Sequence, residues 1–194
     1  MSTSGRARIV VVRHGETEWS LSGRHTSRTD LPLTEGGRRR AEELAAALSG
    51  PFALVLCSPL RRARETCEIA GFAGQAEIDD DLHEWDYGQY EGLTTPEIRA
   101  DNPDWSLWRD GCPGGERPGE VAARADRVVA RLADAGGDAL AFAHGHLLRV
   151  LAARWVSADA AFGARLALGA GAISVLGYER DTRVIERWNL TPAG

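Results

Sequence analysis

The stretch IVVVRHGETEW, residues 9–19, decides the fold and supplies the first candidate functional residues. Its apolar, mostly β-branched run at 9–12 predicts a strand buried on both faces, as is typical of a parallel sheet. The run ends at Arg13, His14 and Gly15. Open α/β sheets bind ligands beyond the carboxyl ends of their strands. A guanidinium and an imidazole at such an end predict a site that handles phosphate groups.

The composition is that of an ordinary globular protein, and it limits the classes of partner. The chain has 194 residues, 43% hydrophobic and 26% charged, so we expect one domain over 1–194. The net charge of −5 argues against general binding to nucleic acid or to anionic membranes, so a local cluster must hold any anionic ligand. All 23 basic residues are arginine, so no lysine can take part in the chemistry.

We expect a cytoplasmic protein, because the sequence carries no export or membrane signal. Too few apolar residues precede the first charges for a signal peptide, and no run approaches the roughly 18 residues of a membrane span. Cys57, Cys67 and Cys112 lack metal-type spacing, so reduced thiols are expected. We expect neither a metal nor a cofactor, and a homodimer is left open.

Hydrophobic periodicity predicts further strands that alternate with helices. Residues 15–30 are expected to form a loop that lines the site. Strands are predicted at 53–57, 76–80 and 139–143, with an edge hairpin at 172–178 and 183–188. Helices are predicted at 34–48, 58–70, 120–135 and 147–155, the first capped by Thr34 and the second started by Ser58-Pro59. The pattern predicts an α/β fold, a three-layer α/β/α sandwich with a mostly parallel sheet and a small lid insertion at about 83–118.

Polar side chains follow three of the predicted strands. Arg13 and His14 follow the first, Ser58 and Arg62 the second, and His144 the strand at 139–143. Because the carboxyl ends of such strands share one edge of the sheet, these groups are expected to converge. Two arginines and two histidines can hold a phosphate dianion, and one histidine can attack phosphorus if its far nitrogen is unprotonated.

A departing alkoxide needs a proton, and the segment DLHEWDYGQYEGL, residues 81–93, offers the acid. Glu84 is the first candidate, because partial burial and a nearby dianion would both raise its pKa. Asp86 and Glu91 are the alternatives. Glu16 is expected instead to anchor the turn after His14 by hydrogen bonds.

Other histidines and the tryptophans have structural interpretations. His25 and His83 are expected to be structural or surface residues. His144 and His146 resemble a metal pair, but no acidic or cysteine ligands lie near them in the sequence, so no metal site is predicted. The tryptophans are expected to pack the lid rather than to stack on bases, and they are Trp85, Trp105 and Trp108.

Four segments, in this order, resemble the histidine phosphatase superfamily, which includes the phosphoglycerate mutases. They are RHGET at 13–17, SPLRRARET at 58–66, LHEWDYGQYEG at 82–92 and AHGH at 143–146. Each motif alone is weak, but the four together are specific. The resemblance implies that His14 is the phosphorylated nucleophile, that Glu84 donates and accepts the proton, and that the phosphate pocket is completed by Arg13, Arg62 and His144. An acid phosphatase-like branch is the most similar.

The resemblance also implies residues that bind substrate. Ser20 follows Trp19 where the family commonly has asparagine, so one phosphate contact is expected to differ. Thr26 and Ser27 match positions that face the substrate, the second of which is commonly glycine. Two further substrate-binding residues are expected, Tyr87 and Gly145.

Hydrolysis is the expected reaction. Cofactor-dependent mutases of the superfamily have a longer insertion between the acid and the second histidine, lysine and arginine side chains that hold a carboxylate, and a shielding C-terminal tail. This chain has no lysine, a shorter stretch from Glu84 to His144, and only residues 191–194 after its last strand. We expect a metal-independent phosphomonoesterase that uses a phosphohistidine on a small phosphorylated metabolite, such as a sugar phosphate. A phosphoglycerate mutase and a noncatalytic phosphate-binding module are the alternatives.

Overall fold

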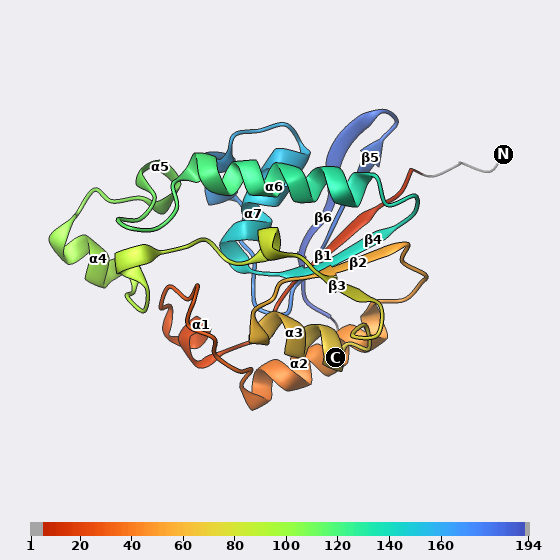
Figure 1. Ribbon diagram of the computed structural model, residues 1–194, viewed down its shortest axis with the longest axis horizontal. Helices are drawn as coiled ribbons and strands as arrows, with labels where there is room; N and C mark the ends of the chain where they lie inside the picture. Colours follow the sequence, from red (N-terminus) through yellow and green to blue (C-terminus); the bar gives the residue numbers. More distant parts are fainter. Residues whose placement is uncertain (1–5, 193–194) are drawn as a thin grey trace.

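A six-stranded sheet forms the centre of the protein in the computed structural model, which describes residues 6–192 (Figure 1). The strand order is β3-β2-β4-β1-β5-β6, in which the first four strands are parallel to one another and β5 is antiparallel to both of its neighbours, β1 and β6. The predicted mostly parallel sheet and its edge hairpin are therefore confirmed. The strands are β1 (Ile9–Arg13), β2 (Leu54–Cys57), β3 (Ala76–Ile78), β4 (Ala139–Ala143), β5 (Ile173–Glu179) and β6 (Thr182–Leu190).

Helices cover both faces of this sheet, which confirms the three layers (Figure 1). One face carries α2 (Glu35–Ala47) and α3 (Arg61–Ile69), and the other α6 (Pro118–Ala133) and α7 (Gly145–Trp155). Successive residues of a strand point to opposite faces. Val11 accordingly belongs to the hydrophobic cluster under α6 and α7, and Val12 to the cluster under α2 and α3. Both are fully buried, which explains why β1 is apolar without alternation.

Short helices lie beyond the carboxyl ends of the parallel strands (Figure 1). They are α1 (Glu18–Ser22), α4 (Thr95–Asp101) and α5 (Leu107–Asp110), with 3₁₀ turns η1 (Asp80–Leu82), η2 (Gly88–Tyr90) and η3 (Ala160–Arg165). Trp85 and Trp105 are buried in the α6–α7 cluster, and Trp108 packs against it. These contacts confirm that the tryptophans have a packing role.

Two local predictions are wrong. The expected loop 15–30 contains α1, which Thr17 and Ser20 cap reciprocally. Ser58-Pro59 does not start α3, because that helix begins at Arg61 after Leu60. The Ser58 hydroxyl bonds instead to the His144 ring.

The two chain ends lie partly outside the residues that the structure describes. Residues 1–5, within the stretch assessed for a signal peptide, and 193–194, within the short C-terminal segment, lie outside the described residues. Across 6–192, every helix is too short or too polar to span a bilayer.

Candidate active site

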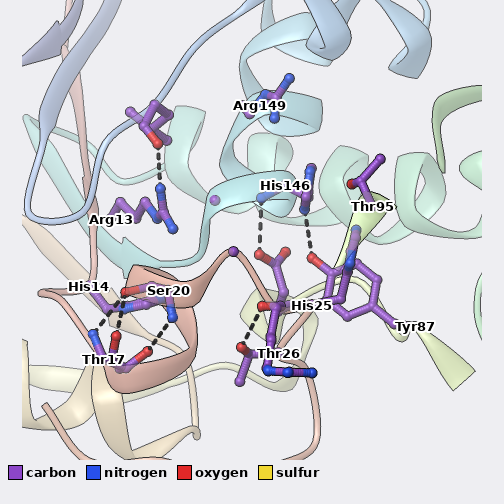
Figure 2. Close-up of a pocket in the computed structure, with 15 residues that line it drawn as sticks. Arg13, His14, Thr17, Ser20, His25, Thr26, Tyr87, Thr95, His146 and Arg149 are labelled. Atoms are coloured by element: carbon purple, nitrogen blue, oxygen red, sulfur yellow. Dashed lines mark hydrogen bonds between the residues drawn. The ribbon is translucent and has the colours of Figure 1, made fainter. Parts of the chain in front are cut away.

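A cavity of about 220 Å³ opens at the carboxyl ends of β1 and β4 (Figure 2). It gathers side chains from the turn after β1, the segment before α4, and the start of α7. Arg62, His144 and Ser27 are buried and are not part of the lining. The lining residues are Arg13, His14, Thr17, Ser20, Gly23, Arg24, His25, Thr26, Glu84, Tyr87, Thr95, Gly145, His146, Arg149 and Leu168.

His14 offers one free ring nitrogen at this cavity. Its Nδ1 lies 2.7 Å from the Gly15 carbonyl oxygen, which can only accept, so Nδ1 carries the proton. Burial, together with the charges of Arg62 and Arg13, lowers the pKa of His14 well below its usual value. The ring is therefore neutral near pH 7 and keeps a lone pair on Nε2. This is the state in which a histidine can attack phosphorus.

The turn that carries His14 is fixed from two helices. The Gly15 N–H donates to the Thr66 hydroxyl of α3 at 2.9 Å. The Glu16 carboxylate accepts a hydrogen bond from the Thr34 hydroxyl at 2.7 Å, so Glu16 anchors the turn as expected. At Gly37 of α2, a Cβ atom would stand 2.3 Å from the Glu16 carbonyl oxygen. Glycine is required there because the turn and the helix are in backbone contact.

Arg13 brings to the cavity a cation with one nitrogen unpaired in the described part of the chain. One terminal nitrogen donates to the Leu168 carbonyl at 2.5 Å, while Nε is buried and has no hydrogen-bond partner among residues 6–192. Nε lies against Gly145, where a Cβ atom would stand 3.2 Å away. Burial lowers the pKa of Arg13, but arginine stays charged in proteins. An unpaired buried donor of this kind favours an anionic ligand.

Arg62 and His144 lie next to His14, but their polar atoms bond to protein groups. The His14 and His144 ring centroids are 5.1 Å apart. Arg62 Nε donates to His144 Nδ1 at 3.2 Å, so the opposite nitrogen of that ring donates to the Ser58 hydroxyl at 2.7 Å. The terminal nitrogens of Arg62 donate to the carbonyls of Thr26, Ser27 and Thr29. Arg62 thus shapes the loop that borders the cavity.

Glu84 reaches the cavity with its carboxylate held by backbone donors. It accepts from the N–H groups of Trp85 at 2.9 Å, His146 at 3.0 Å and Leu147 at 2.9 Å. Burial raises the pKa of Glu84, but interaction with His146 and these three donors lower it overall. The expectation of a raised pKa is therefore wrong for the ligand-free protein, because the start of α7 stabilises the anion.

The two alternative acids are engaged elsewhere. Asp86 pairs with Arg28 at 2.6 Å. Glu91 accepts hydrogen bonds from the backbone N–H groups of Ser27 and Thr29, at 2.9 and 3.0 Å. Neither carboxylate lines the cavity. Of the three candidates, Glu84 is the one in a position to exchange a proton with a ligand.

The cavity also contains residues that were not predicted from the sequence to belong to the site. His25, His146 and Arg149 all line it, although His25 was expected to be structural or superficial. The Tyr87 hydroxyl and His146 Nδ1 share a hydrogen bond of 2.6 Å, and burial lowers the pKa of His146 to about 3. Among residues 6–192, no group of three histidine, cysteine or acidic side chains is arranged to hold a metal ion.

This fold and site define a histidine phosphatase. The chain belongs to the histidine phosphatase superfamily (branch 1), whose family model matches residues 9–191. The family, together with relatives that are an acid phosphatase and a sugar bisphosphatase, identifies a phosphoric monoester hydrolase.

Three comparisons illustrate the relationship. An acid phosphatase of Mycobacterium tuberculosis is 44% identical over 190 residues, which covers 95% of this chain and 93% of the relative. A sedoheptulose 1,7-bisphosphatase of Saccharomyces cerevisiae is 37% identical over 183 residues, which covers 76% of this chain and 67% of the relative. The solved structure of an open reading frame of Mycobacterium tuberculosis superposes with a TM-score of 0.91 at 41% identity, covering 96% of this chain and 99% of that chain.

Proposed function

We propose that the protein is a phosphatase of the acid phosphatase type, which transfers the phosphoryl group of a small sugar phosphate to His14 and then to water. One observation carries the proposal. The neutral His14, its Nδ1–H fixed by Gly15, shares a cavity with the guanidinium of Arg13, whose Nε is unpaired among the described residues. The first relatives, an acid phosphatase and a sugar bisphosphatase, support this class of substrate.

The first half-reaction phosphorylates His14. Its Nε2 attacks phosphorus while the phosphate oxygens are held by Arg13, and we assign Arg62 and His144 to support this pocket. The bond from phosphorus to the ester oxygen breaks, and the protonated Glu84 gives its proton to the departing alkoxide. Arginine offsets the charge that develops on the phosphoryl oxygens.

The second half-reaction returns the enzyme to its starting state. Glu84, now ionised, accepts a proton from water as that water attacks phosphorus. The bond between phosphorus and Nε2 breaks, and inorganic phosphate leaves. We assign substrate contacts to Ser20, Thr26, Ser27, Tyr87 and Gly145, which lie in the cavity lining or next to it.

Hydrolysis of p-nitrophenyl phosphate in the presence of EDTA tests the proposal directly. The wild type should release phosphate without added metal, and His14→Ala should not. If the wild type releases no phosphate from this or any other monoester, the proposal is wrong. A protein that instead interconverts 2- and 3-phosphoglycerate, dependent on a bisphosphate primer, is a mutase.

We also propose a cytoplasmic location. Cys57, Cys67 and Cys112 are all free and buried, in keeping with a reducing compartment. Fractionation of cells that express the protein at its native level would test this assignment, and recovery outside the cytoplasm would refute it.

A further inference from the structure

Arg149 is a fixed cation on one wall of the cavity. It lies on α7 above His146 in the view of Figure 2 and lines the cavity together with His146 and Arg13. Its Nε donates to the Gly163 carbonyl at 2.9 Å, and its guanidinium carbon lies 4.5 Å from the centre of the Trp108 ring. These two contacts hold the side chain in one orientation and leave its terminal nitrogens without a protein partner among residues 6–192.

Burial lowers the pKa of Arg149 and the charge of Glu84 raises it in part, but unlike comparable arginines Arg149 forms no salt bridge within residues 6–192. Arg24 lines the same cavity but lies 3.5 Å from the Glu97 carboxylate. Arg154, on the same helix as Arg149, pairs with Asp126 at 2.7 Å. In the part of the chain that the structure describes, no carboxylate forms a salt bridge with Arg149. A partly buried cation without a salt-bridge partner is stabilised when a ligand brings further negative charge to it.

The spacing along α7 relates Arg149 to the phosphate pocket. Residues four apart lie on one face of a helix, about 6 Å apart along its axis, so Gly145 and Arg149 share a face. Gly145 is the residue that Arg13 Nε lies against. Both arginines therefore line the same cavity, Arg13 beside Gly145 and Arg149 from a position one helical turn further along α7.

We propose that Arg149 binds a second anionic group of the substrate, either a second phosphate or a carboxylate. This inference rests on the proposed phosphatase function. Arg13 and His14 take the phosphate that is transferred, and Arg149 takes the other anion about one turn further along α7. The substrate class is then a sugar bisphosphate or a phosphorylated acid rather than a simple monoester.

Matched substrate pairs test this assignment. We would measure kcat/KM for fructose 1,6-bisphosphate against fructose 6-phosphate, and for 3-phosphoglycerate against glycerol 3-phosphate. The wild type should prefer the compound with two anionic groups in at least one pair. Arg149→Gln should lower kcat/KM for that compound roughly ten- to hundredfold through KM, which is the range for a charge-assisted hydrogen bond. It should change the one-anion compound by less than about threefold.

The controls separate charge from structure. Arg149→Lys should recover part of the preference, and Arg154→Gln, which removes an arginine from the same helix outside the cavity, should keep it. The pair that responds identifies the anion as phosphate or carboxylate. If the wild type shows no preference in either pair, or if Arg149→Gln lowers both members of a pair equally, the inference is wrong.

Hydrolysis and binding measurements together distinguish failure of the Arg149 subsite from failure of the proposed phosphatase function. Phosphate release from p-nitrophenyl phosphate without any two-anion preference would keep the phosphatase and remove the subsite. If no substrate were hydrolysed, the proposed function would fail. Calorimetry of His14→Ala with fructose 1,6-bisphosphate and fructose 6-phosphate, and with 3-phosphoglycerate and glycerol 3-phosphate, would still test the subsite. Equal affinities within both pairs would overturn it.

Discussion

Replacing Glu84 with glutamine should slow the two chemical steps to different extents, depending on the leaving group. The variant loses the acid that protonates the departing oxygen, so kcat for an alkyl phosphate should fall about a hundred- to ten-thousandfold. p-Nitrophenolate leaves without help from an acid, so phosphorylation of His14 by p-nitrophenyl phosphate should stay fast. Hydrolysis of the phosphohistidine also needs Glu84 as a base. We therefore expect a burst of one equivalent of p-nitrophenol followed by slow turnover.

The structure also sets the effect of Glu84→Gln on stability. The carboxylate accepts three backbone hydrogen bonds, from Trp85, His146 and Leu147. An amide oxygen can accept those of Trp85 and Leu147, but its NH₂ group would face the N–H of His146. One unpaired donor costs about 1–3 kcal/mol in the free energy of unfolding. Denaturant titration measures this cost, and kinetics are compared under conditions where both proteins are folded.

Stopped-flow release of p-nitrophenol, set beside steady-state hydrolysis of an alkyl phosphate, decides the role of Glu84. Asp86→Asn is the control, because it removes an ion pair with the exposed Arg28, and we expect it to change either rate by less than about threefold. If Glu84→Gln lowers the burst rate and the alkyl phosphate rate equally, the assignment of Glu84 as proton donor is refuted. If Asp86→Asn lowers the rate with the alkyl phosphate by more than about threefold while Glu84→Gln does not, the role of proton donor belongs to Asp86.

Three further predictions concern the nucleophile, its turn and pH. Wild-type protein quenched during turnover should carry an acid-labile phosphate detectable by mass spectrometry, and His14→Ala should carry none. Gly37→Ala places a Cβ atom 2.3 Å from the Glu16 carbonyl oxygen and should lower the melting temperature and activity, whereas Gly119→Ala, with nothing within 4 Å, should not lower either. Burial lowers the pKa of His14, His144 and His146 in the folded protein. Below about pH 6.5 the unfolded chain therefore binds more protons than the folded protein, so the free energy of unfolding should decrease as the pH is lowered, by up to about 1.4 kcal/mol per histidine and pH unit. Denaturant titrations between about pH 7 and pH 5 that show constant stability would contradict this.

The sequence predicted the layers of the fold because each layer follows a repeating hydrophobic pattern. The run at 9–12 is apolar because both faces of β1 are covered, and the pattern at 34–48 marks α2 together with its Thr34 cap. The short α1 lacks such a pattern, since Leu21 is 65% exposed and its neighbours are polar. The only signal for α1 was the spacing of Thr17 and Ser20, which form the capping box.

The sequence located the site better than it described the contacts there. The three strand ends converge because parallel strands share an edge. The Ser58 hydroxyl was expected to start a helix, yet it bonds to a ring 86 positions away, which no local pattern reveals. The pKa of Glu84 could not be predicted either, because its donors include the first turn of α7. Arg149 could have been found, since it follows Gly145 by one helical turn.

In the proposed mechanism, the protonation states of the cavity make Glu84 the group that links substrate binding to proton transfer. The arginines stay charged, and burial keeps His14 and His146 neutral at physiological pH. Glu84 is ionised without ligand, because backbone donors lower its pKa despite burial. A phosphate dianion beside it would raise that pKa, and a phosphate monoester itself has a second pKa near 6. In this mechanism the proton that the leaving group needs enters with the substrate, or binds Glu84 when the substrate's charge raises its pKa, so we expect activity to increase from neutral to mildly acidic pH.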